Sequence, residues 1–144
     1  MTITIKTAAD VEGMRIAGRL ASEVLDMLTP HVKPGVSTEA LDKLAHDHIV
    51  EVQGGVPAPL NYAPPGYTPY PKSICTSINH QVCHGIPNDR PLKNGDIVNI
   101  DVTVIKDGWH GDTSRMFVVG EGSIAARRLC QMTYDAMWKG IAKV

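Results

Sequence analysis

The sequence predicts an α/β domain of the α+β kind, an antiparallel sheet with helices on one face. Two observations lead to this prediction. Apolar residues recur at helical spacing in three separate segments of the chain. Between Ile97 and Phe117, two runs of alternating residues flank Asp107-Gly108, and Asp-Gly in that setting is the strongest short signal for a type I′ hairpin turn. Strands joined by such a turn are antiparallel.

Each predicted helix has its own start signal. The first follows Thr7–Asp10, a capping-box-like start with Asp in place of Glu. It should end near Thr29-Pro30, because the residue before a proline leaves the α region. The second is capped within Ser37-Thr38 and stopped by Gly54-Gly55. Ser123 caps the third.

A proline-rich loop separates the second helix from the next predicted strand. Residues 56–71 hold six of the ten prolines, which indicates an ordered loop rather than a flexible linker. The same segment contains Tyr62, Tyr67 and Tyr70. Both a structural connector and a pocket wall of rigid aromatic surface fit this composition. Ser73–Ile78 is predicted as a strand, and Cys83–Pro87 as a turn.

The predicted hairpin places two carboxylates on one face of the sheet. Counting outward from the turn pairs Thr103 with Asp112 and Asp101 with Ser114, and side chains alternate between faces. Asp101 and Asp112 thus become diagonal neighbours, about 7–8 Å apart at Cα. Such carboxylates repel one another unless one is protonated or a cation lies between them. Because Asp is depleted in strands, metal binding or acid–base chemistry is favoured slightly over a solvated polar face. A one-residue bulge would undo this geometry.

Composition excludes several classes of function. With 144 residues, 43% of them hydrophobic and 20% charged, and a formal net charge of −1, the chain fits one globular domain or part of one. It is not basic enough to suggest direct nucleic-acid binding or an anionic membrane surface. No apolar run approaches the roughly 18 residues of a membrane span. Three cysteines without framework spacing favour a reduced, cytoplasmic setting.

One histidine pair invites a metal interpretation that the sequence argues against. His80 and His84 have the spacing of a zincin helix, but Gln81 stands where the catalytic glutamate would be. His84 lies in a segment with Gly85 and Pro87. Two interpretations of His84 stay open: a plain loop histidine, and one beside the carboxylates that donates to a developing oxyanion or a leaving nitrogen.

Three contiguous runs show a family resemblance: Tyr70–Pro87, Gly95–Val104 and Gly108–Ser114. Together with the first helix and the Val32–Thr38 turn, they resemble the type I, bacterial-type methionine aminopeptidases over essentially all 144 residues. The resemblance implies the pita-bread (creatinase/aminopeptidase) fold, two halves around a dinuclear metal site. It also implies removal of the initiator methionine from nascent proteins when the second residue is small.

The same resemblance implies roles for individual residues. Asp101 would chelate one divalent metal ion and Asp112 would bridge two, the metal being cobalt, manganese, iron(II) or zinc. His84 would be catalytic and would contact the peptide around the scissile bond. A monovalent cation would lie near the backbone of Asn79 and Gln81. The pocket for the methionine side chain would be lined by Tyr62, Tyr70 and Cys75.

The resemblance also shows what the chain lacks. The remaining ligands of the family, a histidine and two glutamates, come from a second half that cannot be assigned here. We therefore expect residues 1–144 to be the N-terminal half of a single catalytic domain, inactive and poorly soluble alone. The complete enzyme would be a monomer, with association to the ribosome consistent with the family. The loop over Ala63–Pro69 is predicted to be longer than the family's, which would reshape the methionine pocket.

Two alternative functions remain at this stage. One is another pita-bread hydrolase, such as a proline-specific aminopeptidase or a creatinase-like enzyme. The stretch from Cys75 to Pro87 argues against it. The other is a metal-free binding protein of the same fold, against which the presence of both aspartates and His84 argues.

Overall fold

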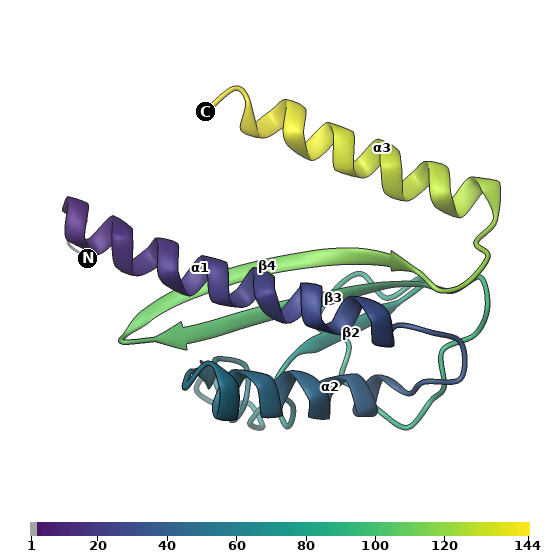
Figure 1. Cartoon of the computed structure of the whole chain (residues 1–144), viewed down its shortest axis with the longest axis horizontal. Coiled ribbons are helices and arrows are strands. Elements are labelled where there is room, and N and C mark those ends of the chain that lie inside the picture. The colour runs from purple at the N-terminus through teal and green to yellow at the C-terminus, as the bar shows by residue number, and fades with distance from the viewer. Residues whose placement is uncertain (1–2) are drawn as a thin grey trace.

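An antiparallel four-stranded sheet forms the centre of the structure, a computed structural model that describes residues 3–144. Its strands are β1 (Val56–Pro57), β2 (Cys75–Ile78), β3 (Ile97–Lys106) and β4 (Trp109–Val118). β3 pairs with β4 along its whole length on one side, and with β2 and β1 on the other (Figure 1). The predicted antiparallel sheet is confirmed.

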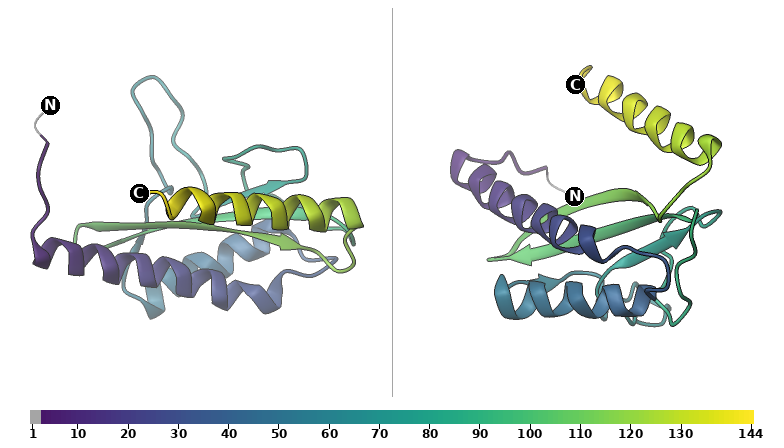
Figure 2. Two further views of the ribbon diagram at one scale, coloured as in Figure 1. Left: turned by 90° about the horizontal axis from the view of Figure 1, so that it is seen from above. Right: turned by 45° about the vertical axis from the view of Figure 1, so that its right-hand side comes forward.

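Three helices accompany the sheet: α1 (Ala8–Leu28), α2 (Thr38–Asp47) and α3 (Ile124–Ile141). α1 and α2 lie on one side of the sheet, whereas two loops rise from the other side (Figure 2, left). α3 leads away from the end of β4, and none of its residues is buried. Within residues 3–144, no helix combines the length and apolarity needed to cross a membrane.

The helix starts lie where the sequence places them. Thr7 caps α1 in a reciprocal capping box, since its backbone N–H donates to Asp10 Oδ2 at 2.7 Å and its Oγ1 accepts from the Asp10 N–H at 3.3 Å. Ser37 caps α2 and Ser123 caps α3. α1 ends at Leu28, as the following Thr29-Pro30 predicts. A π-helical turn, His48–Val52, prolongs α2 before Gly54, a widening that the sequence did not indicate.

The β3–β4 hairpin has the predicted register. Asp107 and Gly108 have φ angles of 50° and 83°, as both central residues of a type I′ turn require. Thr103 faces Asp112 and Asp101 faces Ser114, and the pairing runs without a bulge from one end to the other. The alternation of faces follows directly from this register.

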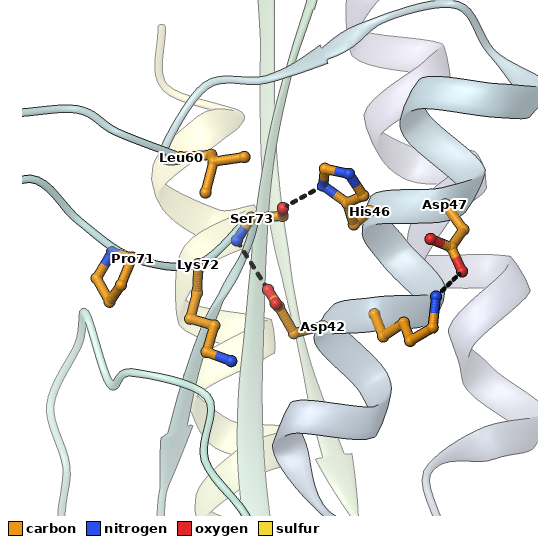
Figure 3. Close-up of a pocket in the computed structure, with 8 residues that line it drawn as sticks. Asp42, His46, Asp47, Leu60, Pro71, Lys72 and Ser73 are labelled. Atoms are coloured by element: carbon orange, nitrogen blue, oxygen red, sulfur yellow. Dashed lines mark hydrogen bonds and ion pairs between the residues drawn. The ribbon is translucent and has the colours of Figure 1, made fainter.

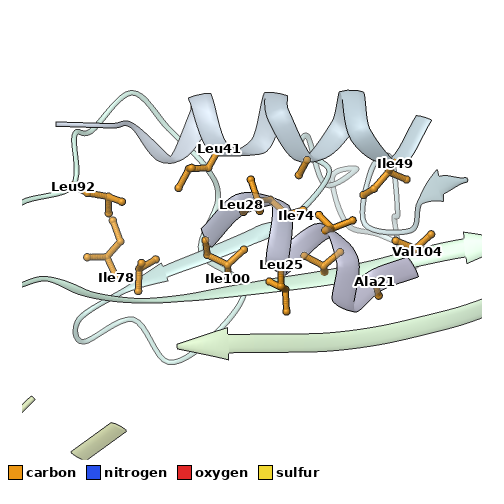
Figure 4. Close-up of a cluster of buried hydrophobic side chains, with 14 of the residues drawn as sticks. Ala21, Leu25, Leu28, Leu41, Ile49, Ile74, Ile78, Leu92, Ile100 and Val104 are labelled. Carbon is orange, nitrogen blue, oxygen red and sulfur yellow. The ribbon is translucent and has the colours of Figure 1, made fainter. Parts of the chain in front are cut away.

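The core lies between the sheet and the two helices α1 and α2 (Figure 4). The side chains that β3 contributes are fully buried: Val98, Ile100, Val102 and Val104. Leu25 and Leu28 of α1 and Leu41 of α2 meet them from the other layer. Each such leucine stabilises the fold by about 1.5–3 kcal/mol relative to an exposed one. The side chains on the opposite face of β3 are not part of this core, so they can contribute to a functional site.

Two strand boundaries differ from the prediction. β1 lies inside the proline-rich loop, and a two-residue strand containing Pro57 gives too short a pattern to recognise. β2 begins at Cys75 rather than Ser73. The reason is that the backbone N–H groups of Ser73 and Ile74 donate to Asp42 Oδ1, at 2.8 and 3.1 Å, instead of to a neighbouring strand.

Candidate metal centre

A cavity of about 400 Å³ opens on the sheet face that points away from α1 and α2. Its floor comes from β3 and β4, while Cys75 of β2 and the proline-rich loop form the wall. The lining residues are Ala58, Pro59, Tyr62, Tyr70, Cys75, His84, Asp101, Thr103, His110 and Asp112. The structure thus brings all six residues predicted for the site into one cavity.

Asp101 and Asp112 form a pair of carboxylates on the cavity floor. Asp101 is half-buried on β3, and Asp112 is exposed on the adjacent strand β4. Thr103 donates from Oγ1 to Asp112 Oδ1 at 3.1 Å, which orients that carboxylate. Burial and the negative charge of Asp112 raise the pKa of Asp101, while His84 acts in the opposite direction. A cation bound between the two carboxylates would oppose this effect.

These donors suit a hard divalent cation. Carboxylate oxygens are preferred ligands of such ions, and a site between the two side chains would remove their mutual repulsion. Among residues 3–144, however, no set of three or more His, Cys, Asp or Glu side chains is gathered as a metal site. Because such ions take more than two ligands, Asp101 and Asp112 fit as part of a larger ligand set.

Tyr70 and Cys75 form the uncharged part of the cavity wall. The Tyr70 hydroxyl donates to the carbonyl oxygens of Ile74 and Gly85, both at 3.1 Å, and burial raises the pKa of this phenol. Burial likewise raises the pKa of the Cys75 thiol. At neutral pH both side chains are therefore neutral, and the thiol is a poor nucleophile.

His84 occupies an unusual backbone conformation at the rim. Its φ angle is +55°, in the left-handed region that most L-residues avoid. The imidazole contributes to the cavity lining together with the two aspartates. The turn predicted over Cys83–Pro87 is not seen: the chain turns earlier, at Asn79-His80, and only bends at Cys83 before His84 reaches the cavity.

Sequence reasoning missed His110 as a lining residue. It lies on β4 opposite Ile105 and is exposed in the cavity. Because strand side chains alternate, His110 shares its face with Asp112 two residues later. Applying the same alternation to the residue two positions before Asp112 on β4 would have placed His110 on the carboxylate face.

A second, smaller cavity of about 280 Å³ lies between α2 and the segment before β2 (Figure 3). His46 Nδ1 and Ser73 Oγ are 2.8 Å apart there, and Asp42 receives the two backbone N–H groups described above. Burial raises the pKa of Asp42. The two backbone bonds to Asp42 fasten the start of β2, and with it the Cys75 wall, to α2.

Residues 12–144 match metallopeptidase family M24, and the chain belongs to this family. Within it, the sequence is 62% identical over 144 residues to methionine aminopeptidase of Rickettsia prowazekii (strain Madrid E), covering all of this chain and 53% of the relative. It is 57% identical over 145 residues to methionine aminopeptidase of Escherichia coli (strain K12), again covering all of this chain and 53% of the relative.

Structural similarity agrees with this family membership. A crystal structure of methionine aminopeptidase from Rickettsia prowazekii superimposes with a TM-score of 0.91 at 61% sequence identity, covering 97% of this chain and 54% of that one. The pita-bread fold expected from the resemblance is confirmed. The chain spans about half the length of the curated relatives it matches.

Proposed function

We propose that this chain carries part of the active site of a methionine aminopeptidase, a hydrolase that removes the initiator methionine from nascent proteins. The observation that supports this most strongly is the shared cavity, which gathers two carboxylates, a histidine and an uncharged wall. The high identity to methionine aminopeptidases favours this substrate class over other members of the family.

Asp101 and Asp112 would hold divalent metal ions at the cavity floor. Asp101 would chelate one ion, and Asp112, oriented by Thr103, would bridge two. When bound, such ions supply Lewis acidity for the scissile carbonyl and for a water molecule. Cobalt, manganese, iron(II) and zinc would all suit these carboxylates together with an imidazole ligand.

His84 would bind the peptide at the scissile bond. Its position at the cavity rim, beside Asp101 and Asp112, supports this role. A ring N–H there can donate to the oxygen that gains charge as the amide carbon becomes tetrahedral, or to the leaving nitrogen. The backbone conformation of His84 would keep this ring N–H in place before substrate arrives.

Tyr62, Tyr70 and Cys75 would form the pocket for the methionine side chain. The single Tyr70 hydroxyl proton is already shared between two backbone carbonyls, so the ring is the part proposed to contact the methionine side chain. A neutral thiol and aromatic surface suit a thioether, because sulfur makes favourable contacts with rings. The predicted effect of the loop over 63–69 on this pocket stays a prediction.

Several finer features belong to the same proposal. The substrate would be a nascent chain with N-terminal methionine, met in the cytoplasm and near the ribosome. The complete enzyme would be a monomer, and a monovalent cation would lie near Asn79 and Gln81. Residues 1–144 would supply the N-terminal half of its single catalytic domain.

Peptide cleavage by the full-length polypeptide that contains these residues tests the proposed function. The substrates are Met-Ala-Ser, Leu-Ala-Ser and Ala-Pro-Ser, each with added Mn²⁺ and with excess chelator. We expect metal-dependent release of methionine from the first peptide and little cleavage of the others. Preferred cleavage of Ala-Pro-Ser would instead indicate a proline-specific aminopeptidase. Absence of cleavage and of Mn²⁺ binding would indicate a binding protein.

A further inference from the structure

The left-handed conformation of His84 needs support from its surroundings. Four non-glycine residues of the described chain have positive φ angles: Asn61, Asn79, His84 and Asp107. Asn and Asp tolerate this region because their short side chains bond locally. His84, whose residue type also enters this region more often than most, is the one member of this group that lines the cavity. Strained residues of this kind persist where neighbouring contacts over-determine them.

Those contacts converge on the next residue, Gly85. Its carbonyl oxygen accepts from the Thr76 N–H at 2.8 Å and from the Tyr70 hydroxyl at 3.1 Å. Its own N–H donates to Ser77 Oγ at 3.1 Å, in a buried position. A Cβ at this position would overlap the carbonyl group of Thr76. Gly85 is thus pressed against β2 and fixed on both of its backbone polar groups.

Ser77 provides the side-chain half of this attachment. It lies on β2 opposite Asn99 of β3 and is 4% exposed. Because side chains alternate, Ser77 shares its sheet face with Cys75, a residue of the cavity wall. Removing its hydroxyl would leave the Gly85 N–H buried without a partner, and the backbone at Gly85 would relax to satisfy that group elsewhere.

We propose that Ser77 is a positioning residue for His84. Its hydroxyl accepts the Gly85 N–H and so holds the preceding residue in the left-handed conformation that directs the imidazole toward the Asp101–Asp112 face. This inference rests on the proposed function, because its kinetic consequence requires His84 to contact the peptide in the transition state. Tyr70 supports the same glycine through its hydroxyl, but its ring also lines the pocket, so Ser77 gives the cleaner test.

The test uses the full-length polypeptide that contains these residues, with Mn²⁺ and Met-Ala-Ser. Ser77→Ala is compared with Ser73→Ala, a matched control. Ser73 is an equally buried serine of the same segment, but its hydroxyl lies against His46 rather than Gly85. We expect Ser77→Ala to lower kcat about 10-fold and to leave KM within 2-fold, because only a transition-state contact is weakened. Ser73→Ala should leave kcat within 2-fold.

A double variant separates positioning from general destabilisation. If Ser77 acts through His84, Ser77→Ala should lower kcat no further in a His84→Ala background. An equal loss in both backgrounds, or an unchanged kcat in the single variant, would show that Ser77 has no positioning role.

Hydrogen exchange and NMR spectroscopy test the backbone conformation at residues 84 and 85 directly, so they apply even if no peptide is cleaved. Amide hydrogen exchange at Gly85 should accelerate at least 10-fold in Ser77→Ala and stay within 2-fold in Ser73→Ala. The three-bond HN–Hα coupling and carbon shifts of residue 84 should leave their left-handed values only in Ser77→Ala. Absence of both changes overturns the inference. A wild-type protein that cleaves no methionyl peptide but shows both changes overturns the proposed function alone.

Discussion

At the scale of single residues, two groups of the cavity lining are unfavourable for folding when considered alone. Asp101 is half-buried beside another carboxylate, an arrangement that raises its pKa and is unfavourable without a counter-ion. His84 is held in a backbone conformation that most L-residues avoid. Both features are typical of functional sites, where strain and like charges persist because the surrounding fold enforces them.

Replacing His84 should separate metal binding from catalysis. In the full-length polypeptide, His84→Ala should lower the turnover of Met-Ala-Ser by about 10²–10³-fold, the effect of losing one oxyanion donor. Metal content by elemental analysis should stay unchanged, because the carboxylates are intact. His80→Ala, at an exposed position outside the cavity lining, is the control. An unchanged turnover number in His84→Ala would exclude the catalytic role.

Replacing Asp101 should stabilise the metal-free fold while removing a proposed metal ligand. Since the folded-state pKa of Asp101 lies above its ordinary value of 3.8, this carboxyl destabilises the fold progressively as pH rises through the folded pKa. With chelator present, Asp101→Asn should therefore melt at a higher temperature than wild type at pH 7 and converge with it near pH 3. The control Asp107→Asn lies in the exposed turn of the same hairpin. Equal melting curves across pH for wild type and Asp101→Asn would contradict this account.

At the scale of elements, short sequence motifs correctly predicted the helix starts and the hairpin, because local contacts determine both. Thr7, Ser37 and Ser123 cap their helices, and Asp107-Gly108 sets a hairpin whose register follows by counting. That register also predicted the Asp101–Asp112 face. The start of β2 and the Gly85 attachment depend on side chains distant in sequence, Asp42 and Tyr70. No periodicity encodes such contacts, so the sequence alone could not reveal them.

We expect Asp42 to contribute strongly to the stability of the fold by anchoring the cavity wall. Asp42→Ala leaves the Ser73 and Ile74 N–H groups buried without their acceptor, and each unpaired group costs about 1–3 kcal/mol. We expect a loss of about 2–4 kcal/mol in the free energy of unfolding by urea. Asp47→Ala removes only an exposed ion pair with Lys43 and should cost at most about 0.5 kcal/mol. Equal losses in the two variants would refute the anchoring role of Asp42.

At the scale of the whole molecule, the described chain exposes apolar surface that a stable isolated domain would cover. α3 contains exposed Leu129, Met132 and Trp138, each more than half accessible. Exposed apolar patches of this kind mark contacts with another surface or a tendency to associate. The chain spans about half the length of the relatives it matches, and we expect this exposed side of α3 to contact another surface.

The 144-residue chain expressed alone should therefore associate and bind a hydrophobic dye. We expect ANS fluorescence and concentration-dependent sedimentation, and no cleavage of Met-Ala-Ser. The double variant Leu129→Lys with Met132→Lys should lower ANS fluorescence, whereas Gln131→Lys on the same helix should not. A monodisperse, dye-free preparation, or one that cleaves the peptide, would show that these residues form a complete unit.

The most direct measurement of the central claim is Mn²⁺ binding followed by electron paramagnetic resonance, with the full-length polypeptide that contains these residues. We predict two bound ions per chain in wild type and in the Asp107→Asn control, whose substitution lies in the same hairpin but outside the cavity. Asp112→Asn should weaken binding at least about 10-fold, since loss of the proposed bridging ligand should cost no less than loss of an outer-shell partner. Mn²⁺ binding by Asp112→Asn that equals the wild type would contradict a metal centre on this face of the sheet.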